Sequence, residues 1–181
     1  MTKKEKQLIK IAKEIISLNE KNETGLILTG SLSLLIQGIK LPRECSDIDF
    51  LCTHETIPED RQYKLDEFYS PVLPKGFEMS YEGKRSQPDS IQYYNQELDI
   101  KIDMLPQYSC YELVKGVKCS DSHETLDAKE SYFRNDRDIY SKEKHFDDIK
   151  YILQKNKKHF EYWTYTYKEW LEEEKHFRPN F

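Results

Sequence analysis

Residues 98–104 (Leu-Asp-Ile-Lys-Ile-Asp-Met) alternate apolar and charged side chains without a break. Successive side chains of a β-strand point to opposite faces, so this pattern predicts a strand with one apolar and one charged face. Residues 46–52 (Ser-Asp-Ile-Asp-Phe-Leu-Cys) predict a second strand, with Ile48, Phe50 and Cys52 on its apolar face. These two segments place a β-sheet at the centre of the chain.

Helices are predicted on both sides of these strands in the sequence. A short apolar run at 26–28 predicts a further strand, and the leucine-rich segment after it predicts a short helix that ends at Gly38. Helical spacing of apolar residues, together with capping residues, predicts helices at 4–18, 122–134, 142–155 and 161–175. We therefore expect an α/β (α+β) fold, a mixed β-sheet flanked by helices. Residues 1–120 would form the core and residues 121–181 a helical C-terminal region, packed together as a single compact unit.

Composition narrows the class of protein. The 13 tyrosines and 8 phenylalanines supply apolar bodies that a disordered chain usually lacks. No apolar run approaches the ~20 residues of a membrane span, so we expect a soluble, cytoplasmic protein without a membrane partner. The four cysteines form no CxxC pair, which favours free thiols over a zinc site. A net charge of −5 argues against a broad nucleic-acid-binding face.

Three acids are candidate metal ligands. Asp47 and Asp49 lie two residues apart on a predicted strand, so both carboxylates leave the same face, about 7 Å apart at the backbone. Two negative charges at that distance repel each other, and Mg²⁺ prefers such carboxylates together with substrate phosphate oxygens. Asp103 lies on the charged face of the other strand, where Asp99 is the rival candidate for a third ligand. The alternative is a solvated face of an edge strand.

Gly30-Ser31 lies where a predicted strand meets a predicted helix. A glycine there lets the backbone approach a phosphate, and the first N–H groups of a helix attract anions, although Gly-Ser pairs are also common in ordinary turns. Arg43 could steer a phosphate from the loop before the acids, or serve only a turn beside Pro42. Lys129 could reach a phosphate as a point charge, or be a solvent-exposed helix lysine.

Taken together, these motifs resemble a known family. Gly30-Ser31, then Asp47-Ile48-Asp49-Phe50, then Ile102-Asp103 followed by Pro106 resembles the minimal nucleotidyltransferase fold of the DNA polymerase β superfamily. Two groups in it are most similar, the antibiotic nucleotidyltransferases and the abortive-infection nucleotidyltransferase toxins. Both have a helix lysine after the third acid and then a segment of the type Lys-His-x-Asp-(x)-Ile. These are matched here by Lys129 and by Lys144-His145-Phe146-Asp147-Asp148-Ile149-Lys150. For His145 and Asp148 the residues alone favour a helix cap or an ion pair.

The resemblance implies an enzyme that transfers NMP from an NTP such as ATP to an acceptor hydroxyl and releases pyrophosphate. It implies two Mg²⁺ ions, with Mn²⁺ as the alternative, held by Asp47, Asp49 and Asp103 as catalytic and metal-binding residues. The third acid of the family tends to precede a proline, which favours Asp103 over Asp99. The nucleotide would contact the residues Gly30, Ser31, Arg43 and Lys129.

The acceptor and the partners stay open at this stage. The acceptor could be a small molecule, a tRNA or other RNA, or a protein hydroxyl, and a toxin-like member would have a cognate antitoxin-like partner. The alternative function is a catalytically silent nucleotide-binding or regulatory module of the same fold.

Overall fold

The computed structural model describes residues 1–22, 25–52, 69–84, 87–106, 109–135 and 138–161, with residues 168–169, 172 and 176. The chain divides into two compact units. The first comprises Met1–Gln37 and Glu44–Asp121, and the second comprises Gly38–Arg43 and Ser122–Phe181.

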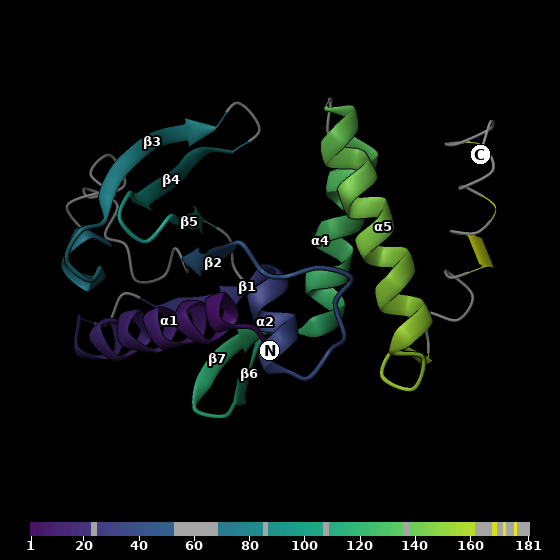
Figure 1. The fold of residues 1–181 in the computed structure, drawn as a ribbon, viewed down its shortest axis with the longest axis horizontal. Helices are drawn as coiled ribbons and strands as arrows, with labels where there is room; N and C mark the ends of the chain where they lie inside the picture. Colours follow the sequence, from purple (N-terminus) through teal and green to yellow (C-terminus); the bar gives the residue numbers. More distant parts are fainter. Residues whose placement is uncertain are drawn as a thin grey trace. The chain divides into compact units, whose positions relative to one another are not determined.

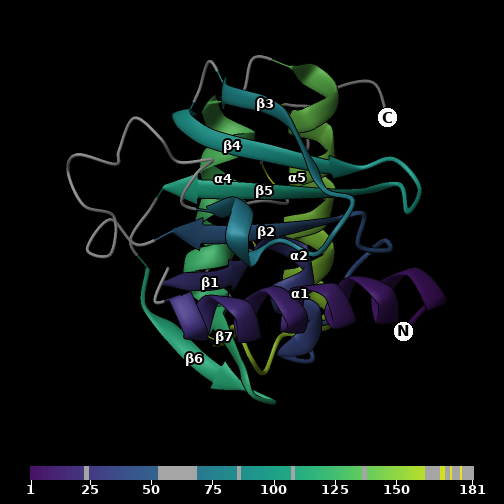
Figure 2. The same cartoon turned by 90° about the vertical axis from the view of Figure 1, so that its left-hand side faces the viewer.

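The first unit is built on one seven-stranded mixed sheet. Its strands, in chain order, are β1 Leu26–Thr29, β2 Asp47–Cys52, β3 Glu78–Lys84, β4 Gln87–Asn95, β5 Ile100–Pro106, β6 Tyr111–Val114 and β7 Val117–Ser120. In space they follow the order β3-β4-β5-β2-β1-β7-β6, which Figure 2 shows from top to bottom. The pairs β2–β5 and β1–β7 are parallel, and the other neighbours are antiparallel. The expected mixed sheet with helices is confirmed.

Strands β2 and β5 follow the predicted alternation closely. Ile48, Phe50, Ile100, Ile102 and Met104 are all buried and form the apolar centre of the sheet. β5 begins at Ile100, however, two residues later than the alternation predicts.

Asp99, which the sequence placed on the charged face of this strand, lies instead in the turn before it. Its φ of 51° is left-handed, a conformation that aspartate tolerates better than most residues. The turn is held by Asn95, whose Oδ1 accepts a hydrogen bond from the Leu98 N–H at 3.0 Å. Asp99 therefore does not share the face of Asp103.

Two helices accompany the sheet in the first unit. α1 (Lys3–Asn22) begins with a capping box, because the Thr2 hydroxyl accepts from the Glu5 N–H and the Glu5 carboxylate accepts from the Thr2 N–H. Its buried stripe includes Leu8, Ala12 and Ile15, and α1 contacts β1 and β7, which lie behind it in Figure 2. α2 (Gly30–Ile36) follows β1 directly and contacts β1 and β2 (Figure 1). A short 3₁₀ turn, η3 (Ser70–Val72), precedes β3.

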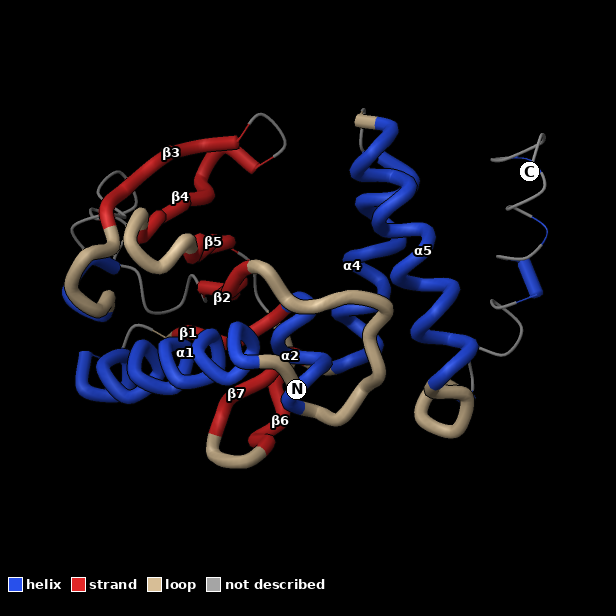
Figure 3. Tube along the Cα trace, viewed as in Figure 1, coloured by secondary structure: helices blue, strands red, loops and turns tan. Residues whose placement is uncertain are grey.

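The second unit contains α4 (Ser122–Asn135) and α5 (Ile139–Lys155), which pack side by side (Figure 3). Phe133 of α4 lies against Phe146 of α5, with ring centroids 5.4 Å apart. The segment Gly38–Arg43 joins this unit through Asn156, whose side chain bonds both the N–H and the carbonyl of Lys40. The two predicted helices are confirmed, and the third, at 161–175, lies largely outside the described residues. Among the residues described, no helix has the length and apolarity needed to cross a bilayer.

Candidate active site

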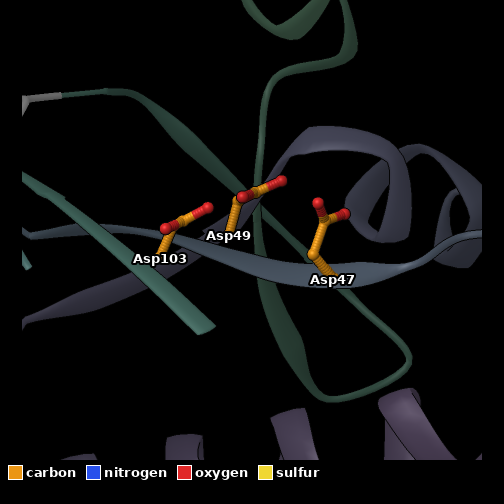
Figure 4. Close-up of side chains that lie close together, drawn as sticks. All are labelled: Asp47, Asp49 and Asp103. Atoms are coloured by element: carbon orange, nitrogen blue, oxygen red, sulfur yellow. The ribbon is translucent and has the colours of Figure 1, made fainter. Parts of the chain in front are cut away.

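Three carboxylates gather on one face of the sheet. Strands β2 and β5 are parallel neighbours, and their register places Asp49 directly beside Asp103, while Asp47 lies two residues earlier on β2. Each residue offers a carboxylate oxygen, and these three oxygens lie within 4.8 Å of one another. Figure 4 shows all three carboxylates on the same side of the ribbon. Asp103 is buried, and Asp47 and Asp49 are partly buried.

This donor set fits a hard divalent cation. All three ligand groups are carboxylate oxygens, the type that Mg²⁺ and Mn²⁺ prefer, and no thiol or imidazole joins them among the described residues. Three negative charges this close repel one another and need positive charge nearby. The acids that the sequence singled out are therefore brought together by strand register, whereas Asp99 is not among them.

Positive charge is supplied within the first unit by Lys101. Its Nζ lies 2.9 Å from Asp103 Oδ2 and 3.7 Å from Asp47 Oδ2. Burial alone would lower the pKa of Lys101, but the hydrogen bond to Asp103 and the charges of Asp103, Asp47 and Asp49 together raise it above its usual value. Lys101 is therefore a protonated ammonium that bridges two of the three acids.

Gln92 also contacts Asp103. Its Nε2 donates to Asp103 Oδ1 at 2.7 Å, from the position opposite Asp103 on the neighbouring strand β4. Neither Gln92 nor Lys101 was identified from the sequence. Lys101 does stand on the charged face of the alternating segment, so a signal for it was present, but Gln92 depends on the pairing of β4 with β5.

Gly30 lies so close to the acid cluster that there is no space for a side chain at this position. Its φ is +67°, and a Cβ built there would lie 2.2 Å from Asp49 Oδ2, so a larger residue would collide with this carboxylate. Ser31 follows it and is buried at the start of α2. Thr29 precedes α2 without capping it, since its hydroxyl accepts from the Ser120 hydroxyl at 2.9 Å instead. That Gly30 and Ser31 contact a triphosphate stays a prediction.

A cavity of about 510 Å³ opens beside the acids. Its walls are polar or charged, with a single aromatic ring, and are formed by Lys4, Ser46, Asp47, Ser80, Gln92, Tyr94, Asp99 and Lys101. The residues Asp47, Gln92 and Lys101 belong both to this wall and to the surroundings of the acid cluster. The cavity therefore adjoins the candidate metal centre.

Arg43 and Lys129 meet in the second unit on one buried carboxylate. The Arg43 guanidinium donates to both oxygens of Asp148, at 3.1 and 2.8 Å, and Lys129 Nζ donates to Oδ2 at 2.9 Å. Burial alone would raise the pKa of Asp148, but these two cations outweigh it and lower the pKa below its usual value. The structure thus confirms an ion pair for Asp148, and nucleotide binding by Arg43 and Lys129 stays a prediction.

His145 lies near this ion-pair cluster. Its Nδ1 is buried and finds no hydrogen-bond partner within the described part of the chain, and its ring stacks on Tyr132 at 5.3 Å between centroids. Burial, helped by the charges of Lys129, Lys144 and Arg43 and opposed by Asp148, lowers the pKa of His145 to about 4. The side chain of Lys144 is exposed.

Comparison with known proteins identifies the fold. No protein-family model matches the sequence, and no curated protein matches it. Several solved structures are similar to it. JHP933 from Helicobacter pylori has a TM-score of 0.52 at 14% identity, covering 88% of this chain and 70% of that one. A protein from H. pylori provisionally identified as a nucleotidyltransferase has a TM-score of 0.53 at 17% identity, covering 88% and 72%.

The third structure is ANT(2'')-Ia in complex with adenylyl-2''-tobramycin. It has a TM-score of 0.53 at 15% identity, covering 82% of this chain and 88% of that one. At such low identity the likeness is one of fold. The chain has the minimal nucleotidyltransferase fold that its motifs predicted.

Proposed function

We propose that this chain transfers NMP from an NTP to an acceptor hydroxyl, with release of pyrophosphate. The observation that carries the proposal is the clustering of Asp47, Asp49 and Asp103, whose ligand oxygens lie within 4.8 Å of one another on a nucleotidyltransferase fold. Three oxygen ligands from two adjacent strands suit divalent cations, and the reaction depends on neutralising phosphate charge.

In the proposed reaction the acceptor oxygen attacks the α-phosphorus of the NTP. The bond from that phosphorus to the bridging oxygen breaks, and pyrophosphate leaves with the electron pair. Mg²⁺ bound by the acids would neutralise phosphate charge and orient the triphosphate. We assign Asp103, the most buried of the three, to activating the acceptor hydroxyl by accepting its proton. Asp47 and Asp49 hold the ions, and Asp103 completes the metal site.

The proposed phosphate contacts are Gly30 and Ser31 in the first unit, and Arg43 and Lys129 in the second. Arg43 is the better candidate for a phosphate contact than Lys129, because the Arg43 side chain is 33% exposed and that of Lys129 only 8%. Arg43 can therefore donate to a phosphate beyond its bond to Asp148, while Lys129 keeps that carboxylate in place. A guanidinium also suits phosphate geometry.

The test is a transfer assay with each radiolabelled NTP, Mg²⁺ and separate acceptor pools. The pools are an aminoglycoside panel that includes tobramycin, total tRNA and a protein extract. We expect label to move into one pool, and Asp49→Asn to reduce transfer by about a thousandfold or more, because a charged ligand is lost from a transition-state site. Glu112→Gln is the matched control, since it makes the same charge change on the exposed strand β6.

Two results would contradict the proposal. Transfer that survives Asp49→Asn at the level of Glu112→Gln would show that the acid cluster does not carry the chemistry. NTP binding without a labelled product in any pool would instead favour the catalytically silent module.

A further inference from the structure

We propose that Lys101 is a positioning residue whose ammonium occupies the cation position of the acid cluster, and that divalent ions load by displacing it. The inference rests on the proposed function, since it concerns the same acids. Lys101 Nζ lies 2.9 Å from Asp103 and 3.7 Å from Asp47, so one ammonium bridges ligands contributed by two strands.

The backbone fixes this arrangement. Lys101 lies two residues before Asp103 on β5 and therefore on the same face, and the parallel register sets it beside Asp47 of β2. An ammonium on a flexible four-carbon chain can follow both carboxylates without moving the sheet.

The contacts of Asp103 show why Lys101 must move. Gln92 donates to Asp103 Oδ1 and Lys101 binds Oδ2, so each oxygen already has a protein partner. The neutral amide of Gln92 can stay and fix the orientation of the carboxylate when an ion arrives. The ammonium cannot, because a second positive charge at the same oxygen would repel the ion.

The cavity provides the space into which Lys101 withdraws. The lysine side chain is 35% exposed and forms part of the wall of the 510 Å³ cavity. Asp99, whose side chain is 80% exposed and lies 3.9 Å from Lys4 Nζ, is in the same wall. Displacement therefore moves the ammonium toward solvent.

The test measures Mn²⁺ affinity of the full-length protein, without nucleotide, by electron paramagnetic resonance at fixed ionic strength. Removing the positive charge that lies 2.9 Å from Asp103 Oδ2 and 3.7 Å from Asp47 Oδ2 should tighten binding roughly tenfold in Lys101→Met. Lys101→Arg keeps the charge and should bind Mn²⁺ no more tightly than the wild type. Lys118→Met is the matched control, because Lys118 lies on β7 over the Tyr111 ring.

A second measurement is thermal unfolding with and without Mn²⁺. Without ions Lys101→Met should melt below Lys118→Met, because its acids have lost their ammonium, and Mn²⁺ should raise its melting temperature more than that of the wild type. Lys101→Gln serves where the methionine variant does not fold. Unchanged or weaker Mn²⁺ binding in the neutral variants would overturn the inference, as would a wild type that binds no Mn²⁺.

These outcomes separate the inference from the proposed function. A wild type that binds Mn²⁺, with tighter binding in Lys101→Met, supports the role of Lys101 even where no acceptor pool takes up label. Transfer of label with equal Mn²⁺ affinity in all variants would support the enzyme and refute the role of Lys101.

Discussion

At the scale of single residues, Gly30 is a position where the backbone conformation and the neighbouring Asp49 both disfavour any side chain. A methyl group there would come within 2.2 Å of Asp49 Oδ2, and the φ of +67° disfavours any side chain. Gly30→Ala should displace the Asp49 carboxylate. Because small misplacements in such sites are costly, we expect about a hundredfold loss of turnover and clearly weaker Mn²⁺ binding.

Gly38→Ala separates crowding from backbone strain. Gly38 also has a positive φ, of +86°, but a Cβ there meets nothing within 4 Å. This control should lose stability, by about 1 kcal/mol, and keep Mn²⁺ binding. Equal Mn²⁺ affinity in the two variants would mean that Asp49 tolerates the methyl group.

The same scale shows which site residues could be predicted from sequence. Asp47 and Asp49 follow from alternation within one segment, a local signal. Asp103 needed the choice between two acids of the same segment, and the left-handed turn at Asp99 decided it. Gln92 and the bridging role of Lys101 depend on which strands are neighbours, and periodicity within a segment carries no information about that.

At the scale of elements, the sequence analysis did not predict the hairpin of β6 and β7. Tyr111, Glu112 and Leu113 are all exposed, so the apolar and charged side chains of this four-residue strand do not separate into a buried and a solvent-facing side. The two residues of the turn, Lys115 and Gly116, both have positive φ, of 52° and 78°. The glycine is the sequence signal for this turn. Two-residue hairpin turns with positive φ at both positions favour the sequence Asn-Gly, and Lys-Gly is an uncommon sequence for such a turn.

The turn predicts an element-scale change in stability. Lys115→Asn should stabilise the first unit by about 0.5–1 kcal/mol, because asparagine accepts the left-handed conformation more readily than lysine. Gly116→Ala should destabilise it by about 1 kcal/mol. Urea unfolding followed by circular dichroism measures both. If the urea midpoints of both variants shift in the same direction from that of the wild type, backbone conformation at the turn does not set the stability of the hairpin.

At the scale of the whole molecule, His145 makes the stability depend on pH. Burial and the nearby Lys129, Lys144 and Arg43 outweigh Asp148 and lower its pKa from 6.5 to about 4. Between these two values the unfolded chain binds a proton that the folded chain does not. Stability therefore falls as the pH falls from about 6.5 toward 4, with no further loss from this group below that. Asp148 has a lowered carboxyl pKa, so its contribution is present above the usual value of 3.8 and is lost as the pH falls through and below that value.

We therefore expect the free energy of unfolding to decrease by about 1–2 kcal/mol between pH 7 and pH 5, a range that allows for solvent screening of a partly buried ring. His145→Phe keeps an aromatic ring against Tyr132 and removes the titrating group, so the decrease should be smaller by that amount. Urea unfolding of both proteins at pH 5, 6 and 7 measures the difference. If the free energies of unfolding of the wild type and of His145→Phe change equally with pH, the His145 ring takes up its proton in the folded protein as readily as in the unfolded chain.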